Sequence, residues 1–262
     1  MKPWNEKSRS PLKGKPLRLP GQSVDEARLA LVERMYETPA LVSLVLVVLA
    51  GMEWARYFFA MPTSPILHSV IAAASVVFTA WRCWRLVPEA RKLRQATEGE
   101  RIVGEYLDQF RERGYRIFHD LIGTGFNVDH VLIGPAGVFT IETKTWSKSN
   151  PDARISFDGS AIRVGNIEPD RNPVVQAFAQ AAWLHELLKE STGKPFPVLP
   201  VIVFPGWFVE QGGTGSRRIW VLNPRALPAF LDREPIRMLD EDVKLASFHL
   251  SRFIRSEEAA RR

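Results

Sequence analysis

Residues 126–144 read FNVDHVLIGPAGVFTIETK, and this stretch decides the fold. Two apolar runs, 126–133 and 138–146, are rich in Val, Ile and Phe, and the residues at 134–137 (GPAG) separate them. Short runs of β-branched and aromatic residues on either side of a turn that contains Gly and Pro predict a β-hairpin.

The turn determines which residues of the hairpin face each other. If Ile133 lies opposite Val138, counting outward from the turn places Asp129 directly across from Glu142. Opposed residues on one face of an antiparallel pair have Cβ atoms about 4.5–5.5 Å apart. Lys144 is two residues beyond Glu142, so strand alternation places it on the same face.

Two carboxylates at that separation repel each other unless they share a proton or a cation. Ligation by oxygen alone suits a hard divalent ion such as Mg²⁺ or Mn²⁺, with water and a substrate phosphate completing the shell. A lysine beside such an ion can orient the attacking water or neutralise charge that develops at phosphorus. The hairpin therefore predicts Asp129 and Glu142 as metal ligands and Lys144 as a catalytic residue, whereas His130 points to the opposite face.

A structural explanation of the same residues stays open at this stage. Glu-x-Lys arises by chance in a chain of this length, and Glu142 with Lys144 could form an ion pair on an exposed sheet face. Glu105, on a helix predicted from Thr97, falls near the polar edge of that helix and could reach the same pocket. The alternative for Glu105 is a solvated helix carboxylate.

The elements around the hairpin predict an α/β domain with a mixed sheet. The residues at 97–100 (TEGE) have the spacing of a capping box and predict a helix start, and Gly114 predicts its end. We expect further strands over 115–121, 197–205 and 219–222, and helices over 172–189, 227–231 and 241–254.

Two apolar stretches precede this domain. Residues 39–52 (PALVSLVLVVLAGM) carry no charge, and residues 66–81 (ILHSVIAAASVVFTAW) carry only a histidine as a polar interruption. A turn signal at 62–65 separates them, and aromatic residues flank both. Because both stretches are apolar on every face, they predict a two-helix transmembrane hairpin over 39–85, and the alternative is a helical hairpin buried in a soluble core.

The segments around this hairpin predict its orientation. Residues 1–22 are expected to be a disordered basic tail, and 23–38 an amphipathic helix that lies on lipid or packs on the soluble domain. Residues 86–94 are expected to be a basic linker to a soluble domain over 95–262. Lys and Arg gather before the first span and after the second, so the positive-inside rule predicts a protein of the cell inner membrane with both termini cytoplasmic.

The net charge of +6 does not by itself indicate a nucleic-acid partner. Residues 1–85 hold 11 Lys and Arg against 6 Asp and Glu, whereas residues 86–262 hold 24 against 23, so the excess belongs to the front of the chain. The single cysteine, Cys83, excludes an internal disulfide framework and a cysteine-rich zinc site.

A set of short motifs resembles the NERD, or nuclease-related, domain over about residues 95–205. The motifs are GERIVGE at 99–105, NVDH at 127–130, GPAGVF at 134–139, IETK at 141–144 and NPVVQ at 172–176. NERD domains are grouped with the PD-(D/E)XK nuclease superfamily, so the resemblance implies a restriction-endonuclease-like mixed sheet flanked by helices.

The resemblance also implies roles for individual residues. Asp129 and Glu142 would be the metal-binding carboxylates and Lys144 the catalytic lysine. The Thr143 carbonyl would be a further metal ligand. Further site residues follow from the helical motifs: Glu105 would be the extra helical glutamate, and Gln176 would position the substrate or water. The chain departs from the superfamily pattern at Val128, which stands where a proline commonly precedes the aspartate.

These observations predict a membrane-anchored nuclease that depends on Mg²⁺ or Mn²⁺ and hydrolyses phosphodiester bonds of DNA or RNA at the cytoplasmic face of a lipid bilayer. The alternative is a catalytically inactive nuclease-fold module that binds nucleic acid or a protein partner at the membrane. The presence of both carboxylates and the lysine favours the enzyme, and the nearly neutral charge of the soluble part favours the module.

Overall fold

The computed structural model of the chain describes residues 17–60, 65–123, 125–148, 150–164, 172–211 and 218–260. Its elements in chain order are α1 (Gln22–Phe59), α2 (Pro65–Asp108), η1 (Gln109–Arg113), β1 (Arg116–Ile122), β2 (Asn127–Gly134), β3 (Gly137–Thr143), β4 (Ile155–Phe157), β5 (Ile162–Val164), α3 (Pro173–Thr192), β6 (Val198–Val203), β7 (Val209–Gln211), β8 (Trp220–Leu222), η2 (Pro224–Ala226), α4 (Leu227–Leu231) and α5 (Asp240–Ala260).

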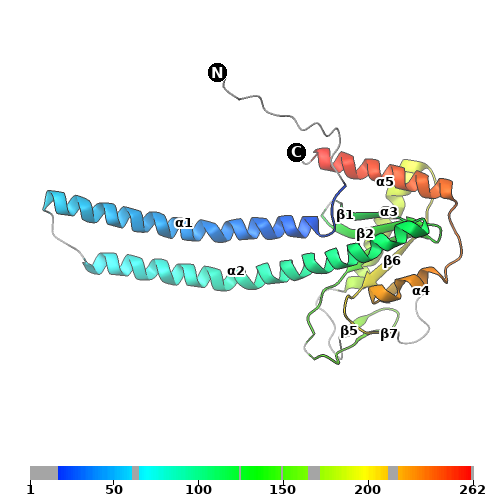
Figure 1. The fold of residues 1–262 in the computed structure, drawn as a ribbon, viewed down its shortest axis with the longest axis horizontal. Coiled ribbons are helices and arrows are strands. Elements are labelled where there is room, and N and C mark those ends of the chain that lie inside the picture. The colour runs from blue at the N-terminus through cyan, green and yellow to red at the C-terminus, as the bar shows by residue number, and fades with distance from the viewer. Residues whose placement is uncertain are drawn as a thin grey trace, which may run out of the picture.

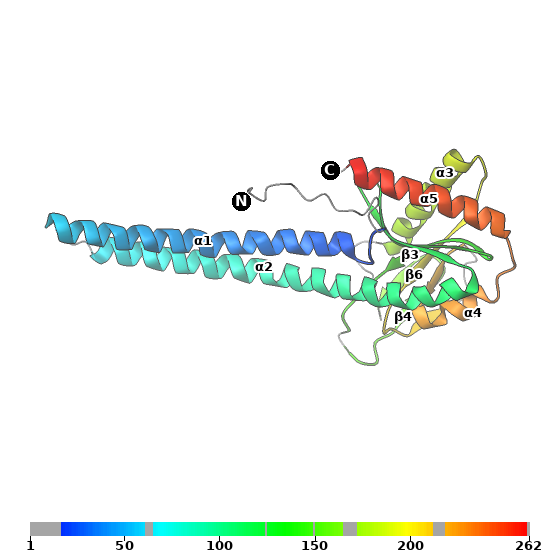
Figure 2. The same cartoon turned by 45° about the horizontal axis from the view of Figure 1, so that its top comes forward.

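Helices α1 and α2 form a long rod that projects from an α/β body (Figures 1 and 2). Both helices are long and apolar enough to cross a membrane. The predicted amphipathic helix over 23–38 and the first predicted span are one continuous helix, α1, which runs through Pro39. The predicted turn at 62–65 lies largely outside the described residues.

Helix α2 differs from the prediction at its second half. Residues 86–94, expected to be a linker, are helical, so α2 passes from the rod into the body without a break. The capping box expected at 97–100 is wrong for the same reason. The Thr97 hydroxyl donates to the Leu93 carbonyl at 3.0 Å, as it does inside a helix, because the preceding residues are strong helix formers.

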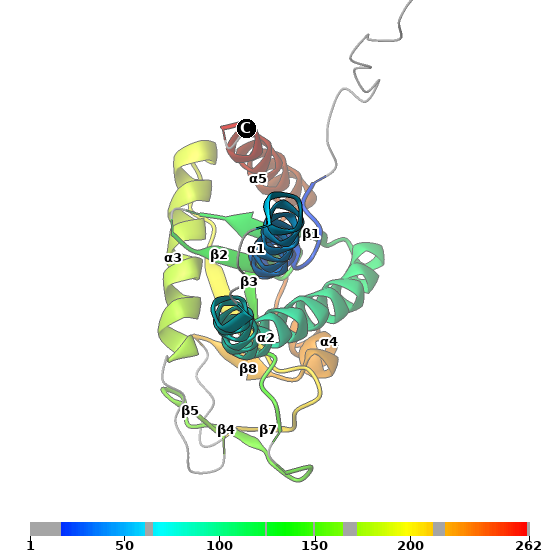
Figure 3. The ribbon, with the colours of Figure 1, turned by 90° about the vertical axis from the view of Figure 1, so that its left-hand side faces the viewer.

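The body is a three-layer α/β sandwich built around the mixed sheet that the sequence predicts. Its main sheet has the strand order β1-β2-β3-β6-β8, in which β1 to β3 are antiparallel and β3, β6 and β8 are parallel. Helices α2 and α4 pack on one face, and α3 and α5 pack on the other (Figure 3). Strand β3 is buried along its whole length, so its polar residues are not on an exposed sheet face.

A second, three-stranded sheet with the order β5-β4-β7 was not predicted. Each of its strands has only three residues, which is too short for an alternating pattern to be recognised. The sheet lies beyond the end of β3, where the chain leaves the central strand.

The rod is fixed to the body at the start of α1. Gly21 precedes the helix and has no side chain that could cap it, so Asp120 of β1 supplies the acceptor. The Asp120 carboxylate accepts hydrogen bonds from the Ser23 backbone N–H at 2.9 Å, from the Ser23 hydroxyl, and from Arg18 Nε at 2.5 Å. An anionic group at a helix N-terminus stabilises the helix.

Candidate functional site

The hairpin register is the one that the sequence predicts. Ile133 pairs with Val138, and the β2–β3 ladder runs to the pair His130–Ile141. The ladder ends one pair short of Asp129 and Glu142. Beyond the ladder, the Thr143 backbone N–H donates to Asp129 Oδ2 at 2.7 Å.

His130 lies on the other face of the sheet, as expected. Its imidazole is fully buried, and its Nδ1 lies 2.9 Å from Nδ1 of His119 on β1. Burial lowers the pKa of His119 to about 4, and it lowers the pKa of His130 well below the usual range. Two ring nitrogens at this distance need one donor and one acceptor, which neutral rings provide. The histidine pair is therefore a structural contact on the face of the sheet opposite to the acidic residues.

Glu142 is the centre of a hydrogen-bond network. Glu142 is 4 % exposed, and both of its carboxylate oxygens accept hydrogen bonds. Lys144 Nζ donates to Oε1 at 2.5 Å, and Gln176 Nε2 donates to the same oxygen at 2.9 Å. Gln180 Nε2 donates to Oε2 at 2.6 Å. Lys144 also donates to Gln176 Oε1 at 3.1 Å, so the two residues hold each other beside the carboxylate.

Helix α3 supplies both glutamines because of how it begins. The Asn172 side chain caps the helix by accepting from the Val174 N–H at 3.0 Å, and Pro173 occupies the first turn. This start places Gln176 and Gln180, four residues apart, on the face that meets β3. Gln180, which also donates to the Asn127 carbonyl at 2.7 Å, was missed by the sequence analysis. The four-residue spacing from Gln176 was the signal that could have found it.

Asp129 is held in a strongly acidic environment. Burial, followed by the charges of Glu142 and Glu100, raises the pKa of Asp129 well above its usual range. The Thr143 N–H and the charge of Lys144 act in the opposite direction. A carboxyl with a raised pKa beside a second carboxylate is a position where a cation would be bound favourably.

The α2 carboxylate that faces this cluster is Glu100 and not Glu105. Glu100 is 6 % exposed, and its burial, with the charges of Asp120 and Glu142, raises its pKa to about 8. Glu105 is exposed and lines a separate groove. Five residues correspond to one full helical turn and about 140° more, so the two glutamates point in clearly different directions.

Close packing of α2 brings Glu100 into place. A Cβ atom on Gly99 would lie 1.8 Å from Cγ2 of Thr145, the residue after Lys144, so only glycine allows this approach. Gln95 Nε2 donates to the Thr145 carbonyl at 2.8 Å and fixes the same contact. This contact could not be predicted from the sequence, because it depends on how α2 packs against the end of β3.

The atoms around the acidic pair that could ligate a metal fit a hard divalent ion. All of them are oxygens, and one buried oxygen atom of this network, Gln180 Oε1, has no hydrogen-bond partner among the described residues. Among those residues, no three Asp, Glu, His or Cys side chains are placed to hold an ion by themselves. Asp129 and Glu142 would therefore hold Mg²⁺ with water or substrate oxygens, which is the usual manner of Mg²⁺ binding.

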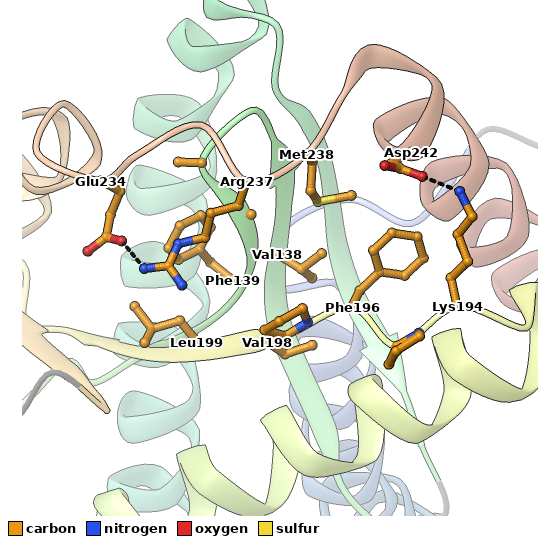
Figure 4. Close-up of a pocket in the computed structure, with 14 residues that line it drawn as sticks. Val138, Phe139, Lys194, Phe196, Val198, Leu199, Glu234, Arg237, Met238 and Asp242 are labelled. Carbon is orange, nitrogen blue, oxygen red and sulfur yellow. Dashed lines mark hydrogen bonds and ion pairs between the residues drawn. The ribbon is translucent and has the colours of Figure 1, made fainter.

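A separate cavity of about 610 Å³ lies at the opposite end of β3 (Figure 4). Val138 and Phe139 contribute to its apolar wall. Ion pairs Arg237–Glu234 and Lys194–Asp242 border it. None of the acidic-pair residues lines this cavity, so it is distinct from the candidate site.

Comparison with known protein families identifies the part of the chain that carries this site. Residues 95–205 match the family model of the nuclease-related domain, NERD. The NERD region runs from the last part of α2 to the end of β6 and contains Glu100, Asp129, Glu142, Lys144 and Gln176. It covers less than half of the chain. No curated protein and no solved structure matches the chain.

Proposed function

We propose that this chain is a divalent-metal-dependent nuclease that hydrolyses phosphodiester bonds of DNA or RNA, with Asp129 and Glu142 as the ligands of Mg²⁺ or Mn²⁺. The observation that carries the proposal is the convergence of two opposed carboxylates, a lysine and two glutamines at the end of β3. The match of residues 95–205 to the nuclease-related domain supports the same reaction class. The grouping with PD-(D/E)XK enzymes stays a prediction.

In the proposed reaction, water attacks phosphorus, one ester P–O bond breaks, and the leaving oxygen departs with a proton. The bound ion would neutralise negative charge on the phosphodiester. The Lys144 ammonium would donate to a non-bridging oxygen as charge builds up there, or hold the attacking water. Gln176 and Gln180 keep the Glu142 carboxylate in one orientation. The Thr143 carbonyl remains a candidate for a further ligand.

We propose further that the rod anchors the enzyme in a lipid bilayer. Apolar side chains on the rod, such as Leu41, Val47 and Val76, are each more than half exposed. Exposing such an apolar surface to water is energetically unfavourable. The start of α1 and the end of α2 lie at the α/β body, and the end of α1 and the start of α2 lie at the far end of the rod (Figure 1). Because Lys and Arg gather on the body side of the spans, the positive-inside rule favours a cytoplasmic location of the body and both termini at the inner membrane.

One observation favours a second candidate, a nuclease fold that binds nucleic acid or a protein but does not cut. Both oxygens of Glu142 already accept hydrogen bonds, and Lys144 is bound to that carboxylate. A site that kept these bonds permanently would offer a phosphodiester neither the Glu142 carboxylate nor the Lys144 ammonium.

Cleavage assays on the full chain in detergent decide between the two candidates. Labelled DNA and RNA are incubated with increasing Mg²⁺ or Mn²⁺. We expect metal-dependent cleavage that Lys144→Ala and Glu142→Gln each reduce by at least about 100-fold. Lys244→Ala, which removes an exposed lysine of α5 paired with Asp240, is the matched control and should cleave normally. Equal cleavage by the Lys144 variant would exclude the proposed mechanism.

A further inference from the structure

A groove of about 700 Å³, which Glu105 lines and which neither Asp129 nor Glu142 lines, is not used by the chemistry described above. Four separate segments line it: α2, the chain after β3, the turn between β6 and β7, and η2. Their contributions include Tyr106, Lys148, Trp207, Phe208 and Arg225. The groove thus combines aromatic rings with two cationic side chains and one carboxylate, that of Glu105.

One lining residue of the groove lies a short way along the chain from the candidate active site. Lys148 follows Lys144 by four residues, so their Cα atoms are at most about 14 Å apart. Trp207 Nε1 donates to the Trp146 carbonyl at 3.0 Å and ties the floor of the groove to the chain that leaves the site. A polymer with its scissile phosphate at Lys144 would therefore reach the groove within a few units.

Phe208 gives the groove an open aromatic surface. Its side chain is 61 % exposed, although large aromatic side chains are usually covered. The Arg154 guanidinium lies 5.3 Å from the ring centroid, and Arg154 pairs with Glu210 at 2.5 Å. This ion pair supports the ring from one side and leaves more than half of the side chain accessible.

Two cations at the groove have no anionic partner in the part of the chain that the structure describes. Neither Lys148 nor Arg225 makes an ion pair with any residue that the structure describes. The Lys148 ammonium lies 5.1 Å from the centroid of the Trp207 ring, which holds it at the wall of the groove. An exposed ring with two unpaired cations complements a chain of alternating bases and phosphates.

We propose that this groove binds unpaired nucleotides of the substrate, with a base stacked on Phe208 and phosphates held by Lys148 and Arg225. The proposal rests on the proposed nuclease function and narrows its substrate to single-stranded nucleic acid. A base offers its π-face only when it is unpaired or unstacked, so a duplex would leave Phe208 unused. Stacking also explains how a body with 24 Lys and Arg against 23 Asp and Glu can hold a polyanion.

Binding measurements without divalent ions test the groove separately from cleavage. Labelled oligothymidylate and oligouridylate are titrated with the full chain in detergent and EDTA, and fluorescence anisotropy reports binding. We expect Phe208→Ala to weaken single-strand binding by about 5- to 150-fold, the range for one base–aromatic stack. Phe208→Trp should retain binding, whereas Phe208→Leu, which keeps an apolar side chain but has no π-face, should lose it. Lys148→Ala should lower the slope of log affinity against log salt by about 0.7.

Phe248→Ala is the matched control. Phe248 lies on α5, is 58 % exposed and carries Arg252 at 5.9 Å from its ring centroid, so it reproduces the Phe208 arrangement away from the groove. We expect this variant to bind as the wild type does. Equal losses in the two alanine variants, or binding that Phe208→Ala does not change, would overturn the proposal. If the wild type binds single strands through Phe208 but never cleaves them, the groove stands and the nuclease function fails. If the wild type cleaves but the Phe208 variants bind normally, the nuclease function stands and the proposed role of the groove fails.

Discussion

Replacing Glu100 by glutamine tests how strongly the acidic cluster opposes ionisation. Burial and the charges of Asp120 and Glu142 raise the pKa of Glu100 to about 8, from an ordinary value of 4.5. The unfolded chain loses this proton near pH 4.5, whereas the folded protein holds it until about pH 8. Between these values the folded state binds more protons, so its stability falls as the pH rises.

The size of the effect follows from the two pKa values. Glutamine has the shape of a protonated glutamate and cannot ionise. Glu100→Gln should therefore be more stable than the wild type by about 1 kcal/mol at pH 5 and by about 4 kcal/mol at pH 8. For a protein of this size, the difference at pH 8 corresponds to a Tm about 10 °C higher.

Thermal unfolding of the full chain in detergent and EDTA, followed by tryptophan fluorescence from pH 5 to pH 8, measures this difference. Glu98→Gln is the matched control, because Glu98 lies on the same helix, is exposed and pairs with Arg94 at 2.8 Å. It should change stability by no more than about 0.5 kcal/mol at any pH. A Glu100→Gln variant whose advantage does not grow with pH would refute the placement of Glu100 among the acidic residues.

Three further predictions concern the residues that support the site. Gly99→Ala should lower the free energy of unfolding by about 1–3 kcal/mol and reduce cleavage, because the new Cβ would lie 1.8 Å from Thr145 Cγ2. Adding Thr145→Ser removes that methyl group, so the double variant should regain both stability and cleavage in unfolding and cleavage assays. Burial lowers the pKa of His119 to about 4, so the stabilisation that the neutral imidazole provides is lost as the pH falls below 6.5. The wild type should therefore lose about 2 kcal/mol of its stability advantage over His119→Gln between pH 7 and pH 5. An advantage that stays constant in unfolding experiments would contradict this prediction. Asp120→Asn should release the start of α1 and speed hydrogen exchange at the Ser23 amide, whereas an unchanged exchange rate would show that Asp120 does not hold the rod.

The hairpin and its register could be predicted because a short turn between two apolar runs leaves few ways to pair the strands. The predicted register, with Ile133 opposite Val138, is the one that the structure has, and His130 lies on the face that was predicted for it. The mixed sheet followed from the order of strand-like and helix-like runs. These features depend on contacts between residues that are close in sequence.

The supporting residues were harder to predict because long-range packing places them. Glu100 faces the cluster only because α2 continues from the rod and approaches β3 at Gly99. Sequence spacing pointed instead to Glu105, which carries a family motif but lies on another side of the helix. Asp120 caps α1 across almost a hundred residues of chain, and no local pattern connects it to Ser23.

Calorimetric titration of the full chain with Mg²⁺ and Mn²⁺ tests the central claim most directly. We expect one site in the wild type, and we expect Glu142→Gln and Asp129→Asn each to weaken it by at least about tenfold, since each removes half of the protein's carboxylate ligation. Glu241→Gln, which changes an exposed glutamate at the start of α5, should bind as the wild type does. Unchanged metal affinity in the Glu142 and Asp129 variants would contradict the account.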